Sequence, residues 1–161
     1  MTRLAKHHTA AVVLLAWSLA GCAHAGCTTS FSGMAFGAYA TLVSADVTST
    51  AQIDVICQGM PGGGSYTLAL GPSADGVGNR ISTRHLANTR GGDLMAFNLF
   101  TDANRTAVWG DGVTGALILG TLDAGGRPSS MVVYGKIPAG QRTLRAGSFH
   151  GSMTITLTYN P

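Results

Sequence analysis

Hydrophobic and polar residues alternate strictly near the C-terminal end of this sequence. Between Phe149 and Tyr159, every second residue is apolar or glycine, and the intervening residues are histidine, serine or threonine. A period of two places the two sets on opposite faces of a β-strand, and β-branched threonine and isoleucine suit such a half-buried surface. We therefore predict one long strand over residues 149–159. Its apolar face consists of Phe149, Gly151, Met153, Ile155, Leu157 and Tyr159.

Shorter apolar or alternating segments recur through the rest of the chain, separated by clusters of Gly, Pro, Asn and Asp. No helical periodicity of useful length follows residue 26. Many short strands with regular turn signals are typical of an antiparallel sandwich. We therefore predict an all-β domain without internal repeats or a domain linker. The segments concerned are 34–40, 51–57, 66–70, 80–86, 93–100, 106–109, 113–122 and 131–137.

The last predicted strand raises the question of its neighbours. A long strand needs a hydrogen-bonded partner on each side, or it leaves an adhesive edge. The sequence ends at Asn160-Pro161, so we expect no later strand of this chain to pair with it. The partner that covers this edge is therefore expected to decide the function.

Length and charge limit the number of domains and the classes of binding partner. The chain has 161 residues, including 23 Gly, and 45% of its residues are hydrophobic, which is sufficient for one domain with a real core. Without Arg3 and Lys6, eight of the ten basic residues remain against seven Asp, so residues 26–161 carry a net charge of about +1. No segment has a cluster of basic residues, which argues against nucleic-acid binding.

The first 25 residues have the features of a secretory signal peptide. Arg3 and Lys6 precede the apolar stretch 10–20, which is too short to span a bilayer, and Ala23-His24-Ala25 is a small-x-small cleavage site. Cleavage there would leave 26–161 as the mature domain. An alternative overlaps it, because Leu19-Ala20-Gly21-Cys22 resembles a bacterial lipobox in which Cys22 would be lipidated. That processing would produce an outer-membrane lipoprotein.

Either processing route leaves Cys27 and Cys57 as the two remaining cysteines. A secreted chain meets an oxidising compartment, in which such a pair forms a disulfide. We therefore expect a Cys27–Cys57 bridge; the alternative is two free buried thiols.

An ordered set of short segments in this chain resembles the spore coat protein U domain family, which includes the subunits of archaic chaperone–usher pili. The resemblance covers residues 27–159. The segments, in order, are Phe36-Gly37-Ala38-Tyr39, Ile53-Asp54-Val55-Ile56-Cys57, Arg80, Leu94-Met95-Ala96-Phe97-Asn98-Leu99-Phe100-Thr101-Asp102, Trp109-Gly110-Asp111-Gly112, Tyr134-Gly135-Lys136-Ile137-Pro138 with Gln141, and Gly147-Ser148-Phe149.

The resemblance implies an incomplete immunoglobulin-like antiparallel β-sandwich of pilin type, which lacks its last strand. A periplasmic chaperone, and then the neighbouring pilus subunit, would fill the gap by donor-strand complementation on the way through an outer-membrane usher to the cell surface. The implied role is structural, in adhesion or biofilm formation. The acceptor groove would be formed on the last strand by Phe149, Met153, Ile155, Leu157 and Tyr159.

Two features depart from the family pattern. Cleavage after Ala25 leaves only Gly26 before the first cysteine, which is too short for a donor strand, so we expect a distal, capping or non-polymerising subunit. Gly151 stands where many relatives carry Asp, and no role follows for it. A free-standing spore-coat or envelope protein remains the alternative to a pilus subunit.

The residues that could carry chemistry do not form a recognisable site. Asp93, Asp102 and Asp111 do not have the spacing of a calcium loop, and His85 and His150 are not accompanied by a nucleophile elbow. We therefore expect no enzymatic activity, no cofactor or metal and no small-molecule substrate. Among other motifs, Trp109 is expected to pack beside a turn, and Arg80, Arg84 and Arg90 are expected to lie on a solvated face.

Overall fold

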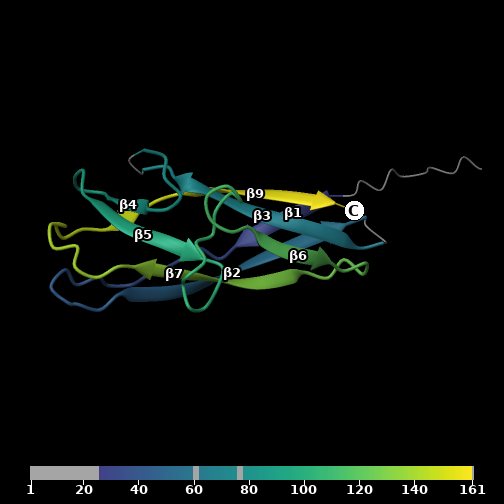
Figure 1. Ribbon diagram of the computed structural model, residues 1–161, viewed down its shortest axis with the longest axis horizontal. Coiled ribbons are helices and arrows are strands. Elements are labelled where there is room, and N and C mark those ends of the chain that lie inside the picture. Colours follow the sequence, from purple (N-terminus) through teal and green to yellow (C-terminus); the bar gives the residue numbers. More distant parts are fainter. Residues whose placement is uncertain (1–25, 60–61, 76–77, 161) are drawn as a thin grey trace, which may run out of the picture.

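The computed structural model describes residues 26–59, 62–75 and 78–160, which fold into two antiparallel β-sheets (Figure 1). The predicted signal peptide over 1–25 and the lipobox cysteine, Cys22, lie outside these residues. The strands are β1 Gly26–Phe31, β2 Val47–Gln58, β3 Gly64–Ser73, β4 Arg84–Asn88, β5 Leu94–Phe100, β6 Ile118–Leu122, β7 Ser129–Ile137, β8 Phe149–His150 and β9 Met153–Asn160. The predicted all-β sandwich is therefore confirmed.

The two sheets differ in size and enclose one core. One has six strands in the order β1-β2-β7-β5-β4-β8, and the other has three in the order β6-β3-β9. Period-2 alternation sends every second side chain of β2, β3 and β7 between the sheets. Ile53, Leu68 and Val133 have no exposed surface at all. No helix in the described ranges is long and apolar enough to cross a membrane.

A disulfide joins Cys27 of β1 to Cys57 of β2, which confirms the predicted pairing. The two cysteines are direct partners across the antiparallel pair. The bridge therefore fastens β1 to the edge of the six-stranded sheet, where β1 has only β2 as a hydrogen-bonded neighbour among the described strands.

The prediction of one long strand over 149–159 was wrong, because the chain changes sheets within it. Phe149 and His150 form β8, which pairs with β4 of the larger sheet, whereas β9 starts at Met153 and pairs with β3 of the smaller sheet. Gly151 lies at the crossing, where a Cβ atom would come within 3.1 Å of the carbonyl oxygen of His85. The absence of a side chain at Gly151 thus allows the crossing segment to approach β4 closely.

Other differences concern segments that are apolar without being strands. Residues 34–40 form no strand, residues 106–109 contribute only isolated bridges, and residues 80–83 precede β4 as a bend. Only the last part of 113–122 is a strand, β6. The predicted strands over 51–57, 66–70, 93–100 and 131–137 correspond to β2, β3, β5 and β7. Apolar composition alone therefore predicted strands at positions that the structure does not place in a β-sheet.

The turn after β5 is held by one carboxylate. Asp102 accepts hydrogen bonds from the backbone N–H of Ala107 at 2.8 Å and from the backbone N–H and hydroxyl of Thr106 at 3.0 and 2.9 Å. These bonds, with that from Ala107 the largest contribution, lower the pKa of Asp102 below its ordinary value of 3.8.

We expect the charge on Asp102 to make the fold sensitive to acid. A carboxylate whose pKa is lower in the folded state stabilises the fold above its unfolded pKa, and this contribution is lost as the pH falls through the folded value. Stability should therefore fall below about pH 4, and Asp102→Asn should reduce this dependence. Urea unfolding at a series of acidic pH values measures how the free energy of unfolding depends on pH. Part of this dependence should remain in Asp102→Asn, because the pKa values of Asp54 and Asp111 are also lowered. The same pH dependence in the variant and the wild type would contradict the role of Asp102.

We also expect the disulfide to account for a large part of the stability. Replacing both Cys27 and Cys57 with alanine should lower the free energy of unfolding by about 3–4 kcal/mol, because the bridge closes a loop of roughly 30 residues in the unfolded chain. Urea unfolding of the variant measures the loss, and the wild type with a reductant is the matched control. Equal stability with and without the bridge would contradict this expectation.

Candidate functional site

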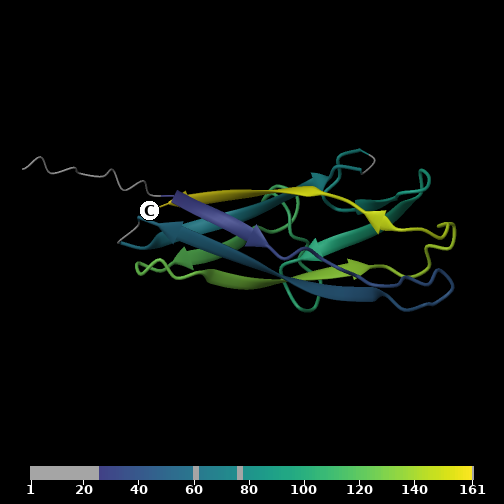
Figure 2. The same ribbon diagram turned by 180° about the vertical axis from the view of Figure 1, so that it is seen from behind.

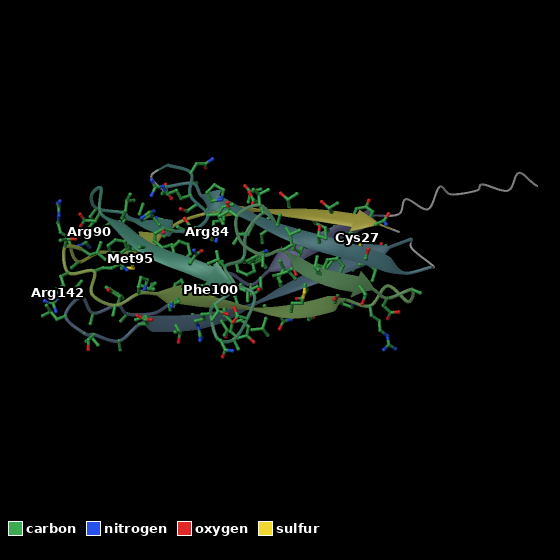
Figure 3. All side chains as sticks on the ribbon, in the orientation of Figure 1. Cys27, Arg84, Arg90, Met95, Phe100 and Arg142 are labelled. Atoms are coloured by element: carbon green, nitrogen blue, oxygen red, sulfur yellow. A yellow bond between two sulfur atoms is a disulfide. The ribbon has the colours of Figure 1, made fainter. Side chains whose placement is uncertain are left out.

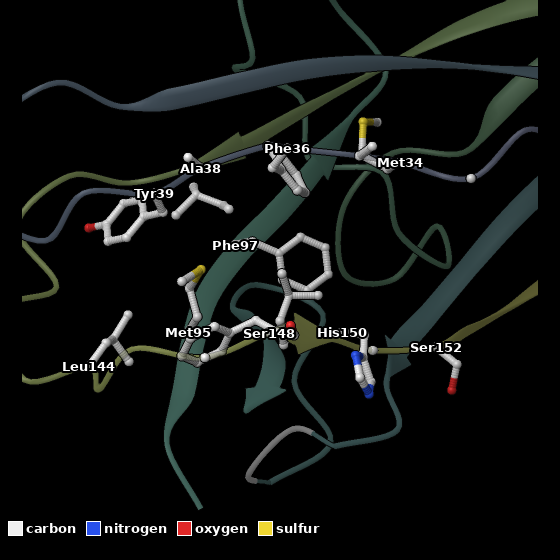
Figure 4. Close-up of a pocket in the computed structure, with 18 of the residues that line it drawn as sticks. Met34, Phe36, Ala38, Tyr39, Met95, Phe97, Leu144, Ser148, His150 and Ser152 are labelled. Atoms are coloured by element: carbon white, nitrogen blue, oxygen red, sulfur yellow. The ribbon is translucent and has the colours of Figure 1, made fainter. Parts of the chain in front are cut away.

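An apolar groove of about 1090 Å³ lies along one side of the sandwich. One wall consists of Phe31, the last residue of β1, and residues 33–42; the other consists of residues 144–153 and Ile155, which include β8 and the start of β9. The floor lies between the walls, where Figure 4 shows Met95 and Phe97 of β5. The floor residues are Leu70, Leu86, Met95, Phe97, Trp109 and Ile137.

The groove lies where the two sheets separate. Figure 2 shows β1 (purple) and β9 (yellow) close together near the end marked C, and diverging toward the other end. β1 forms one edge of the larger sheet and β9 forms one edge of the smaller sheet. Within the described chain, no strand lies between these two edges, so the core is open there.

The first wall is an extended segment held by a few side-chain contacts. Phe36 packs edge-on against Phe97, with ring centroids 6.0 Å apart. It also covers Gly135 of β7, where a Cβ atom would come within 2.7 Å of the ring. The hydroxyl of Tyr39 donates to the carbonyl oxygen of Pro138 and accepts from the backbone N–H of Gln141, each at 3.0 Å. These contacts place a row of aromatic side chains along the groove.

The second wall comes from the C-terminal segment. Met153 and Ile155 point inward from β9 but are only half-buried, whereas Tyr66, Leu68 and Leu70 on the neighbouring strand β3 are at most 2% exposed. The difference arises because β3 has a neighbour on each side, β6 and β9, whereas β9 pairs only with β3 among the described strands. Ser148, His150 and Ser152 add polar groups near this wall (Figure 4).

The structure brings three of the five predicted groove residues together. Phe149, Met153 and Ile155 line the groove. Leu157 packs against the core further along β9, and Tyr159 is 38% exposed, so neither is part of the lining. Sequence reasoning missed the opposite wall, although the aromatic run around Phe36 and Tyr39 was a visible signal for it.

Trp109 packs in the floor, as the sequence predicted. Its side chain is fully buried, and the indole N–H donates to the carbonyl oxygen of Leu68 at 3.0 Å. The following turn is closed by Asp111, whose carboxylate accepts from the backbone N–H groups of Val113 and Thr114 at 2.9 and 2.6 Å. Trp109 is thus held by a hydrogen bond to β3 and is followed by a turn that Asp111 closes.

The expectation that Arg84 lies on a solvated face was wrong. Arg84, which is labelled in Figure 3, is 0% exposed and donates hydrogen bonds to three main-chain carbonyl oxygens. Arg80 and Arg90 are exposed, as expected. Burial lowers the pKa of Arg84 to about 10, and attraction to Asp111 opposes that shift. The guanidinium group therefore stays charged at neutral pH.

The described residues contain no group of three His, Cys, Asp or Glu side chains that could hold a metal ion. His85 and His150 lie on neighbouring strands, but only His150 lines the groove. Asp93 pairs with Arg145, and Asp102 and Asp111 hold their own turns. What the groove offers is an apolar surface and an unpaired strand edge, which suit the binding of an extended peptide segment.

Comparison with known proteins identifies a family. The sequence profile of the Spore Coat Protein U domain matches residues 13–156. No curated protein matches the chain.

Two solved structures are similar to this chain. One is the CsuC–CsuE chaperone–tip adhesion subunit pre-assembly complex from the archaic chaperone–usher Csu pili of Acinetobacter baumannii, with a TM-score of 0.56 at 18% identity. The match covers 83% of this chain and 40% of that chain. A chaperone–tip adhesin complex of CFA/I fimbriae biogenesis has a TM-score of 0.47 at 10% identity, over 83% of this chain and 42% of that one. The likeness to the Csu complex shows the fold.

We expect Gly135 to be essential for the first wall. A methyl group at this position would overlap the ring of Phe36, so Gly135→Ala should displace the ring and lower the stability by about 1–3 kcal/mol. Gly92→Ala is a matched control, because a Cβ atom there meets nothing within 4 Å. Urea unfolding compares the two variants, and equal effects would show that the Phe36 contact is unimportant.

Proposed function

Since this chain belongs to the Spore Coat Protein U domain family, whose profile it matches over most of its length, we propose that it is a structural subunit of a chaperone–usher surface fibre. The family is structural and not enzymatic. The observation that carries the proposal is the apolar groove between β1 and β9. Its geometry fits an inserted strand from another protein.

The unpaired edge of β9 supplies main-chain groups for such a strand. β9 is eight residues long, and one of its two edges has no strand partner in the described chain. A strand added here would gain main-chain hydrogen bonds along β9 and would place alternate side chains in the groove. Register would follow from those side chains, since a shift by one residue would turn the apolar set toward water.

The half-buried walls supply the driving force. Phe36, Met153 and Ile155 keep part of their apolar surface exposed in the chain alone. An inserted strand would cover them and bury its own apolar side chains, each of which contributes about 1.5–3 kcal/mol when fully buried. Several such side chains would make the completed sandwich much more stable than the chain alone.

The partners follow from this mode of assembly. A periplasmic chaperone would occupy the groove first, and the N-terminal extension of a neighbouring subunit would replace it at the outer-membrane usher. The chain would then reach the cell surface in a fibre with a role in adhesion or biofilm formation. The signal peptide over 1–25, lipidation at Cys22 and a distal or capping position in the fibre remain predictions.

A free-standing coat or envelope protein is the second candidate, because the family description names a spore coat. Such a protein would have to protect the edge of β9 by itself, since an exposed strand edge promotes association. The open groove therefore favours the fibre subunit.

We expect a charge in the groove to prevent strand capture. Ile155→Asp would place a carboxylate in the apolar lining, where burial by an inserted strand leaves it unpaired. Co-expression with the periplasmic chaperone from the same locus, followed by purification of the complex, should give at least a roughly tenfold lower yield of complex than the wild type.

Thr154→Asp is the matched control, because Thr154 is the adjacent residue of β9 and is exposed. This variant should be captured like the wild type. Equal capture of both variants would refute the groove as the binding site. A wild-type chain that is a stable monomer and ignores the chaperone would instead favour the coat or envelope protein.

A further inference from the structure

Arg84 buries a positive charge behind the groove without a carboxylate in contact. Its Nε donates to the carbonyl oxygen of Gly71 at 2.8 Å, and its Nη2 donates to the carbonyl oxygens of Leu70 and Trp109, both at 2.9 Å. Nη1 donates to Oδ1 of Asn98 at 2.6 Å. A fully buried arginine is rare unless its donors are satisfied, and here the planar fork meets acceptors from three separate segments.

Three of the four acceptors are main-chain carbonyl groups at or beside gaps in the strand pairing. The pairing of β3 with β9 shifts register between Leu70 and Ser73, so the ladder is interrupted at Gly71 and Pro72, directly after Leu70. Trp109 lies outside the named strands, in an isolated bridge. A buried carbonyl group without a hydrogen-bond donor destabilises a fold. Arg84 supplies donors at the interruption where no strand does.

Asn98 extends the same network to β5 and to the bend before β4. Its amide nitrogen donates to the carbonyl oxygens of Ile81 and Ser82 at 3.0 and 2.9 Å. Its Oδ1 accepts from Arg84 and from the backbone N–H of Leu99. Asn98 is itself buried. The two side chains thus join β3, β4, β5 and the Trp109 segment by polar contacts.

Two of the residues held in this way, Leu70 and Trp109, also line the groove, whereas Arg84 does not. Arg84 therefore binds the main chain of two lining residues without lining the groove itself.

We propose that Arg84 is a positioning residue for this floor. It holds Leu70 and Trp109 in the strand-accepting geometry before any partner is bound, so that a partner does not have to order them on binding. The link to strand capture rests on the proposed function; the positioning of the floor does not.

Trp109 provides a readout that needs no partner. The chain has two tryptophans, so Trp17→Phe in the full chain makes fluorescence report on Trp109 alone. In this background Arg84→Met removes the donors but keeps an apolar stem, and Arg84→Lys keeps a charge without the fork. Val55→Ala is the matched control, because Val55 is 1% exposed and does not line the groove. It weakens the core without touching the network.

The measurement is acrylamide quenching of Trp109 in variants that circular dichroism shows to be fully folded. We expect Arg84→Met and Arg84→Lys to raise the quenching constant by about twofold or more, because the floor opens locally, and Val55→Ala to leave it unchanged. Quenching equal to that of the parent chain in both Arg84 variants would overturn the proposal, as would an equal increase in Val55→Ala. If Arg84→Met fails to fold, Arg84→Lys provides the comparison.

Capture by the chaperone from the same locus tests the link to function separately. Arg84→Lys should be captured about tenfold less than Val55→Ala. Raised quenching with normal capture would show that Arg84 positions the floor residues, and it would overturn the proposed role of Arg84 in binding the chaperone. If the parent chain itself is not captured, the proposed function fails, and the positioning role is decided by the quenching result.

Discussion

The unpaired edge of β9 is the constraint on which the rest of this structure depends. β9 contributes the apolar side chains Met153 and Ile155 to the core, but within the described chain it has only β3 beside it. A sandwich of this size is normally closed by strands on both sides of such a position. Here the larger sheet instead ends at β1, and the space between β1 and β9 is a groove with an apolar floor. The disulfide to β2 and the contacts of Phe36 and Tyr39 keep the opposite wall in place.

An open groove must keep its shape without the strand that would complete it. Hydrophobic contacts alone would favour collapse of the walls, since the exposed apolar surface is costly. The buried polar network around Arg84 and Asn98 holds the floor in place without a partner. Hydrogen bonds can do this because they constrain the orientation of the bonded groups as well as their separation. A network of this kind specifies one arrangement at the cost of burying a charge. The fold thus combines an unfinished core with a polar framework behind it.

Much of the fold was predictable, because its strongest signals are local. Alternation over 51–57, 66–70 and 131–137 marked β2, β3 and β7, and two cysteines in a chain with a predicted signal peptide indicated the bridge. Alternation could not show the break at Gly151, since the same period continues while the chain moves from one sheet to the other. The wall at 34–40 has strand-like composition but is held by side-chain contacts instead of a ladder. The burial of Arg84 depends on the carbonyl groups of Leu70, Gly71 and Trp109, which only the folded arrangement brings together.

The most direct test of the account is hydrogen exchange at the backbone amides of β9 and of residues 33–41, with and without the periplasmic chaperone. The backbone amides of β9 that point away from β3 should exchange rapidly in the chain alone, because no strand of the described chain accepts hydrogen bonds from them. On binding they should become strongly protected, together with amides of the facing segment, while β2 and β7 change little. Strong protection of the whole of β9 in the chain alone, or no change when the chaperone is added, would contradict the claim that this groove accepts a strand.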